Sequence, residues 1–260
     1  MTKFINSENV IMIGIITSIL AGFSTGIGAI PIFFTKNVSS KTLDTMLGFA
    51  AGVMLAATSF SLIIPAIEAG GGGIKGAGIT AIGIILGGMF LDFADKHSPH
   101  VHLLDKREEG NKSSLARMWL FIIAITIHNF PEGLAVGVGF GDENVSNGII
   151  LAIGITLQNL PEGLAVALAL VREKYSTKKA FTIALLTGLV EPIGAFIGLM
   201  LVNIARPLLP LILAFAAGAM LFVISDEVIP ETHKNGYERQ ATYGVLIGFV
   251  IMMFLDVVLG

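Results

Sequence analysis

The stretch "WLFIIAITIHNFPEGLAVGVGF" (residues 119–140) places a histidine, an asparagine and a glutamate in the middle of an apolar run. Residues 150–170, "ILAIGITLQNLPEGLAVALAL", repeat the arrangement with glutamine in place of histidine. Each run is long enough to cross a bilayer, which needs about 20 apolar residues. In a bilayer, the polar side chains of both runs would lie at a depth where they are costly, so they require partners inside the protein.

The composition of the whole chain also indicates a membrane protein. The 260 residues are 54% hydrophobic and only 13% charged, whereas a soluble domain carries about 25% charged residues. The mean hydropathy is +0.83, and 31 glycines suit helices that pack closely in lipid. A net charge of −3 without a basic patch argues against a nucleic-acid partner. With no cysteine, disulfides and thiolate metal sites are excluded.

We therefore predict an all-α integral membrane protein with a single transmembrane domain over residues 1–260. Eight segments are long and apolar enough to span the bilayer. The single long hydrophilic connection, residues 96–115, carries three of the five histidines. The expected spans are about 9–35, 42–67, 76–95, 116–140, 147–171, 178–202, 207–231 and 241–259.

The distribution of basic residues predicts the orientation of these spans. Of the 16 Lys and Arg residues, all but Lys3, Lys75 and Arg206 fall at one membrane face. Because cytoplasmic loops are enriched in Lys and Arg, this face is expected to be cytoplasmic. Both termini are then extracytoplasmic, the histidine-bearing loop is cytoplasmic, and the chain is a multi-pass protein of the cell (inner or plasma) membrane.

Seven polar side chains fall near mid-bilayer depth in three consecutive spans. In the fourth and fifth spans the first residue of each motif and its glutamate are four apart, so they share one helix face. An unpaired carboxylate at that depth costs about 3 kcal/mol. Hydrogen bonds between helices, about 0.6–2 kcal/mol each, are the plain alternative, but three carboxylates together favour a binding site. The seven residues are His128, Asn129, Glu132, Gln158, Asn159, Glu162 and Glu191.

A proline lies beside each of the three glutamates. Pro131, Pro161 and Pro192 cannot donate a backbone hydrogen bond, so kinks are predicted in the fourth, fifth and sixth helices. Each kink would free carbonyl groups next to the polar side chains. Irregular backbone is tolerated in a membrane only where it lines a protein-enclosed or water-filled cavity.

The chemistry of these side chains favours a divalent transition metal. Imidazole, carboxylate and amide oxygen together suit Zn, Fe, Mn, Co or their relative Cd. A Mg or Ca site would be all oxygen, and His128 argues against one. Glu132 and Glu162, from antiparallel helices, could bridge a binuclear pair, which stays a hypothesis. The metal would be the transported substrate, and no organic cofactor is expected.

The motifs "HNFPEGLAVGVGF" and "QNLPEGLAVALAL" resemble the fourth- and fifth-helix signatures of the ZIP (Zrt/Irt-like) metal transporters, in particular their bacterial GufA-like branch. The resemblance covers nearly the whole chain. It implies that the seven polar residues are metal ligands. The segment "FAAGVMLAATSFSLIIPA" (residues 49–66) resembles the second helix of the family, which implies a thioether ligand from Met54, with ordinary packing as the alternative.

The resemblance further implies an elevator mechanism, in which helices one, four, five and six move against two, three, seven and eight. One residue departs from the family pattern, because many relatives carry histidine where this chain has Gln158. An amide oxygen is a harder and weaker ligand for zinc than imidazole. The substitution could therefore shift selectivity toward Mn, Fe or Cd.

Two further polar clusters carry weaker signals. His97, His100 and His102 in the cytoplasmic loop could form a metal-sensing patch or be incidental. The segment "SDEVIPETH" (residues 225–233), at the cytoplasmic end of the seventh span, could release metal or be an ordinary helix end. Its candidate ligands are Asp226, Glu227 and His233.

The resulting prediction is a secondary transporter, not an enzyme, that moves divalent cations, zinc first, inward through the mid-membrane site. The expected partners are metal ions and the lipid bilayer, with a homodimer left open. The main alternative is a proton-linked organic solute carrier that uses the same carboxylates. An intramembrane protease is a weaker alternative, because the metalloprotease motif His-Glu-x-x-His is missing.

Overall fold

The computed structural model describes residues 7–35, 37–97, 114–140, 145–172 and 174–259, and every regular element within these ranges is a helix, as predicted. Short 3-10 or π segments, labelled η, interrupt or extend several of the α-helices. The elements are α1 (Ser7–Ala29), η1 (Ile30–Phe33), α2 (Ser40–Ala57), η2 (Thr58–Ile63), α3 (Ile64–Ala69), α4 (Gly73–His97), α5 (Ser114–Gly139), α6 (Val145–Arg172), α7 (Thr177–Gly188), α8 (Glu191–Ile204), η4 (Arg206–Leu208), α9 (Leu209–Val223), η5 (Ile224–Val228), α10 (Ile229–Thr232) and α11 (Glu238–Leu259).

Seven described segments are long and apolar enough to cross a membrane. They are Asn9–Phe33, Ser40–Ala69, Gly73–Ala94, Val145–Arg172, Thr177–Ile204, Arg206–Thr232 and Glu238–Leu259. The remaining expected span falls on α5, a helix of 26 residues whose side chains are described from Thr126 onward. The count of eight spans therefore stays a prediction.

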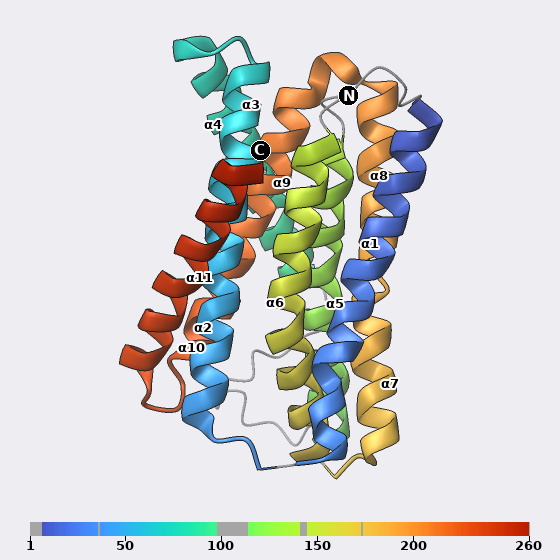
Figure 1. The fold of residues 1–260 in the computed structure, drawn as a ribbon, viewed down its shortest axis with the longest axis vertical. Coiled ribbons are helices and arrows are strands. Elements are labelled where there is room, and N and C mark those ends of the chain that lie inside the picture. The colour runs from blue at the N-terminus through green and yellow to red at the C-terminus, as the bar shows by residue number, and fades with distance from the viewer. Residues whose placement is uncertain (1–6, 36, 98–113, 141–144, 173, 260) are drawn as a thin grey trace.

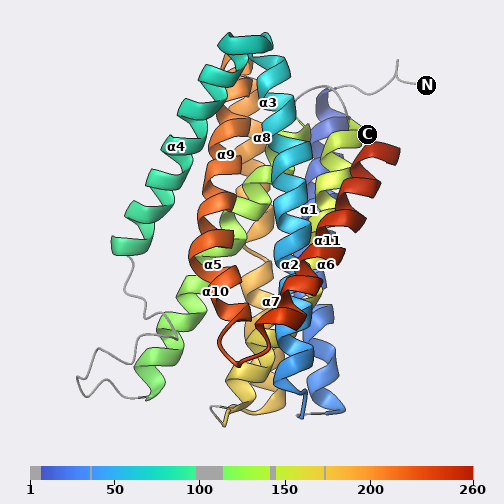
Figure 2. The same cartoon turned by 90° about the vertical axis from the view of Figure 1, so that its left-hand side faces the viewer.

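The helices run roughly parallel to the long axis of the molecule and fall into two groups (Figure 1). The first group contains α1, α5, α6, α7 and α8, and the second contains α2, α3, α4 and α9 to α11 with η2 and η5. Figure 2 shows α4 leaning away from the bundle at its lower end. The start of α1 and the end of α11 lie at the same end of the bundle (Figure 1), as an even number of crossings would give. Which end faces the cytoplasm stays a prediction.

Within each group, helices touch backbone to backbone at glycines. A Cβ added to Gly163 of α6 would lie 1.9 Å from the carbonyl oxygen of Thr25 in α1. In the second group, a Cβ on Gly52 of α2 would lie 2.0 Å from the carbonyl oxygen of Val245 in α11. Such contacts are possible only without a side chain, because these distances are far below van der Waals contact. Small residues at helix interfaces have this role in membranes.

The contact between the two groups is of a different kind. It is filled by apolar side chains, among them Val53 and Met54 of α2, Ala135 of α5 and Leu151 of α6. Of the described glycines, only Gly154 of α6 would meet the other group first, and its Cβ would reach the flexible end of a methionine, Met252. The groups are thus closely joined internally and meet each other through side chains.

Two π-helical segments, which the sequence pattern does not predict, occupy matched places in the second group. Each lies two residues before a proline: η2 before Pro65 and η5 before Pro230. Because proline has no N–H, the carbonyl four residues earlier loses its helical donor. At η2 this is the carbonyl of Ser61, which accepts a hydrogen bond from Asn147 Nδ2 of α6 at 3.2 Å. The Ser61 hydroxyl also bonds to Asp256 of α11.

The prolines of the first group act differently from one another. Helices α5 and α6 continue through Pro131 and Pro161 without interruption, so the kinks expected there stay predictions. The sixth span divides instead: α7 ends at Gly188, and α8 begins at Glu191 with Pro192 in its first turn. A proline fits the first turn of a helix, where its missing N–H is not needed. The sixth span is therefore broken into two helices beside its glutamate rather than bent within one.

Candidate functional site

The polar residues of the paired motifs are buried in the first helix group. They come from the middle of α5 and α6 and from the first residue of α8. Asn129, Glu132, Gln158, Asn159 and Glu191 are each at most 1% exposed. His128 is slightly more open, with a side chain that is 13% exposed.

The three carboxylates converge on one region. Glu132 interacts electrostatically with both Glu162 and Glu191, and Glu162 interacts with His128. Like charges this close in a buried setting repel one another and call for a neutralising cation or proton. Three consecutive spans therefore deliver their carboxylates to the same place, as their shared depth in the sequence indicates.

Many oxygen atoms of this cluster lack a partner within the described protein. They comprise both carboxylate oxygens of Glu132, and one oxygen each of Gln158, Asn159, Glu162 and Glu191. Buried polar atoms are nearly always hydrogen-bonded, and an unsatisfied one costs about 1–3 kcal/mol. So many free acceptors together suit a bound cation.

The arrangement is not yet a closed coordination shell. Among the described His, Asp and Glu residues, no three are placed to hold one metal ion together. Asn129, Gln158 and Asn159, the amide residues predicted as ligands, are not included in this statement, because it covers only His, Asp and Glu. An ion held here would have to draw the carboxylates of α5, α6 and α8 closer to one another.

Asn159 links the site to α1, a contact that the sequence does not reveal. Its Nδ2 donates to Glu191 Oε1 at 2.7 Å and to the backbone carbonyl oxygen of Ala21 at 2.9 Å. Because any residue type has a backbone carbonyl, no sequence signal could have identified Ala21 as a partner.

Met54 lies in the apolar core between the groups. It is fully buried, and its cluster includes Ile127 and Leu157, the residues directly before His128 and Gln158. Its place beside the start of both motifs is compatible with the ligand role and with the packing role.

The imidazole of His128 forms an ion pair with the carboxylate of Glu227 in η5. This pair joins α5 of the first group to the second group. In the sequence the two residues belong to separate clusters, and their contact depends on how α5 packs against α9 and η5. Glu227 is thus the member of the "SDEVIPETH" segment that reaches the motif residues.

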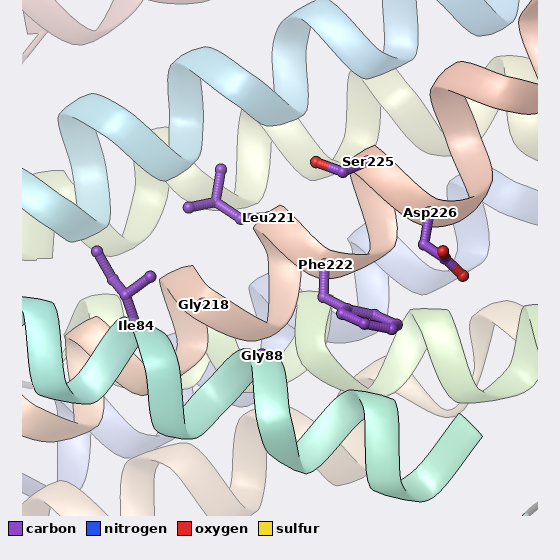
Figure 3. A pocket seen from close by; sticks show the side chains of 7 residues that line it. All are labelled: Ile84, Gly88, Gly218, Leu221, Phe222, Ser225 and Asp226. Atoms are coloured by element: carbon purple, nitrogen blue, oxygen red, sulfur yellow. The ribbon is translucent and has the colours of Figure 1, made fainter. Parts of the chain in front are cut away.

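The other members of that segment have different surroundings. Asp226 is exposed at the edge of a pocket of about 330 Å³ between α4 and α9 (Figure 3). His233 Nδ1 lies 2.9 Å from the hydroxyl of Thr232 and 2.8 Å from the carbonyl oxygen of Ile229. The pocket is lined by Ile84, Gly88, Gly218, Leu221, Phe222, Ser225 and Asp226. Asp226, Glu227 and His233 do not form a joint site in this conformation.

The side chains of the three loop histidines lie outside the described part of the chain. His100 and His102 lie outside the described residues, and His97 ends α4 with its side chain outside them as well. The metal-sensing patch that they could form stays a prediction.

Comparison with known proteins gives a consistent result. The family model described as "ZIP Zinc transporter" matches residues 93–256. Zinc transporter GufA of Myxococcus xanthus is 45% identical over 95% of this chain and 99% of its own length. Zinc transporter ZIPB of Bordetella bronchiseptica is 41% identical over 92% of this chain and 79% of its own. The human zinc transporter ZIP11 is 37% identical over 91% of this chain and 94% of its own length.

These matches cover both paired motifs and nearly the whole chain. They agree with the apolar helices, the buried carboxylates and the free acceptor atoms of α5, α6 and α8. The molecule is a multi-pass membrane transporter and not an enzyme: the chain belongs to the ZIP family of zinc transporters.

Proposed function

We propose that this protein carries divalent transition-metal cations, zinc foremost, into the cytoplasm through the buried cluster on α5, α6 and α8. The observation that carries the proposal is the set of unpaired buried acceptors on Glu132, Gln158, Asn159, Glu162 and Glu191. Protein groups leave these atoms unsatisfied, and a cation would satisfy several at once.

The donor set supports a transition metal over calcium or magnesium. His128 supplies an imidazole, which zinc, iron, manganese and cobalt sites use and which oxygen-only sites lack. Zinc is placed first because the relatives are named zinc transporters. Cadmium, iron, manganese and cobalt are the further candidates. Gln158 offers an amide oxygen, and this ligand favours zinc less strongly than an imidazole at the same position would. The site holds either one ion or a binuclear pair.

An elevator movement is supported by the two kinds of helix contact. Backbone-to-backbone contacts at glycine join helices within a group, as at Gly163 and Gly52. Packed interfaces of this kind allow little sliding because atoms are interlocked at van der Waals distance. The apolar side chains between the groups include flexible ones such as Met54 and Met252. The proposed carrier moves the first group, with its ligands, as one body against the second.

The test is metal uptake by purified protein in liposomes. Wild-type protein is expected to take up zinc in a saturable manner, with Fe, Mn, Co and Cd competing to different extents. Glu132→Ala and His128→Ala are expected to abolish uptake with unchanged membrane insertion. Glu238→Ala, at an exposed glutamate that begins α11, is the matched control and keeps wild-type flux. Wild-type uptake by Glu132→Ala and His128→Ala would exclude the proposed site.

A proton-linked organic solute carrier is the competing function for the same carboxylates. It predicts that purified protein binds no transition metal and that zinc does not accumulate in the liposomes. Saturable zinc binding that Glu132→Ala removes would rule this alternative out.

A further inference from the structure

The amide of Asn159 has a fixed orientation. One atom of this amide contacts both the carbonyl oxygen of Ala21, at 2.9 Å, and Oε1 of Glu191, at 2.7 Å. A backbone carbonyl can only accept a hydrogen bond. The contacting atom must therefore be the NH₂ group, because an amide oxygen in its place would face two acceptors. Asn159 Oδ1 consequently points elsewhere, where it has no partner among the described groups.

The place taken by this NH₂ group has the surroundings of a cation site. It lies between a carbonyl oxygen and a carboxylate oxygen in a fully buried region. Those are oxygen ligands for a metal ion, and here the amide hydrogens use them instead. The NH₂ group thus supplies the positive end of a dipole where a cation would otherwise bind.

From this geometry we infer that the chain carries one divalent ion at a time, because the Asn159 amide occupies the position of a second. The inference rests on the proposed function, since it concerns how many ions the same site takes. Asn159 Oδ1, Glu191 Oε2 and the free oxygens of Glu132 remain for the single ion. Asn159 then determines how many ions the carrier binds, and its hydrogen bond to the carbonyl oxygen of Ala21 fixes the orientation of its amide.

An asparagine outside the site provides a control within the molecule. Asn147 lies in the first turn of α6, and its Nδ2 donates to the backbone carbonyl oxygen of Ser61 at 3.2 Å and not to a residue of the cluster. An aspartate at position 147 adds the same charge to the same helix and leaves the Asn159 amide in place.

The test counts bound ions. Protein in lipid nanodiscs is dialysed against saturating Cd²⁺, and cadmium per molecule is measured by mass spectrometry, minus the amount bound by the Glu132→Ala variant. Loop histidines are removed throughout by His97→Ala, His100→Ala and His102→Ala. Wild type is expected to hold one ion, Asn159→Asp two and Asn147→Asp one. In Asn159→Asp, a carboxylate replaces the NH₂ group between two oxygens, and a second ion relieves their repulsion.

A second measurement counts the bound ions by ¹¹³Cd NMR. The ¹¹³Cd NMR spectrum of the loop-histidine variant is expected to show one resonance that Glu132→Ala removes, and Asn159→Asp adds a second. Two site-dependent ions in the protein with native Asn159 would overturn the inference and leave the transport function standing. So would a single ion in folded Asn159→Asp, or two ions in Asn147→Asp. If no Glu132-dependent ion binds at all, the proposed function itself fails.

Discussion

At the scale of single residues, the two motifs differ where they are expected to set metal preference. His128 offers an imidazole that is already paired with Glu227. Gln158 offers an amide that interacts with the carboxylate of Glu132 on α5. The first motif residue therefore contacts the second helix group in this conformation, whereas its counterpart on α6 contacts a carboxylate of the proposed site itself.

Replacing Gln158 by histidine is expected to favour zinc over manganese by about tenfold, because imidazole suits zinc while oxygen ligands suit manganese. The change corresponds to about 1.4 kcal/mol of differential binding. The measurement is the concentration of each metal that halves uptake of a tracer. His128→Gln, the reverse exchange at the matched position, should lower the zinc preference. An unchanged zinc-to-manganese ratio in both variants would contradict this role for the asymmetry.

In the proposed site, the Glu227 carboxylate would compete with metal for His128, because it contacts the imidazole Nε2. Removing it by Glu227→Gln is expected to tighten metal binding about two- to fivefold, the range that corresponds to a partly exposed ion pair. Metal titration of purified protein measures the change. Glu231→Gln is the control, because Glu231 pairs with Lys234 instead. Weaker binding by Glu227→Gln would show that Glu227 is itself a ligand.

At the scale of helices, close packing at glycine determines which elements are joined most tightly and so which are expected to move together in the proposed transport movement. The helix α2 approaches α11 so closely that a Cβ on Gly52 would lie 2.0 Å from the Val245 carbonyl oxygen. By contrast, Gly78 of α4 has nothing within 4 Å of such a Cβ. Substitutions at these two positions therefore distinguish the packing role of glycine from the effect of its low helix propensity.

Gly52→Ala is expected to lower the free energy of unfolding by about 1–3 kcal/mol, because the helices must separate to admit the methyl group. Gly78→Ala should leave stability unchanged or raise it by up to about 1 kcal/mol, since alanine favours the helix. Thermal unfolding of both variants in the same detergent measures the difference. Equal effects at the two positions would argue against the close contact of α2 and α11.

The sequence predicts this level of structure only in part. Apolar length locates the segments, because lipid requires a continuous helix. The effect of each proline is less predictable, since a neighbouring helix can supply the lost donor: α6 continues through Pro161, whereas the chain breaks before Pro192. Spacing within a helix places His128 and Glu132 on one face. The contacts of His128 with Glu227 and of Asn159 with Ala21 depend on packing between helices, which no local pattern encodes.

At the scale of the whole molecule, the proposed transport movement requires the two helix groups to slide past each other. Polar contacts that join the groups must then break and reform. One is the hydrogen bond from Asn147 of α6 to the carbonyl of Ser61 in η2. Within the first group, Gly26 of α1 lies against Leu185 of α7 and should stay there throughout.

Because the chain has no cysteine, paired cysteines can test this division. Oxidation of Val53→Cys with Gly154→Cys is expected to stop zinc uptake, since the crosslink joins α2 to α6 and a Cβ on Gly154 would lie 3.7 Å from Cγ1 of Val53. Reductant should restore uptake. Oxidation of Gly26→Cys with Leu185→Cys, within one group, should leave uptake unchanged. A Cβ on Gly26 would lie 3.2 Å from that of Leu185, near the distance that disulfides span. Full transport by the first oxidised pair would exclude the movement.

The difference between glycine contacts and side-chain contacts also bears on how such a carrier can diversify. Inside a group, the backbones of α6 and α1 meet at Gly163, so almost any replacement there disturbs the ligands beside it. Between the groups, Gly154 faces the end of Met252, and either residue can change size by small steps. If the groups slide as proposed, turnover speed can be adjusted at the surface between them without altering the cargo, and relatives with the same metal preference can evolve to run at different rates.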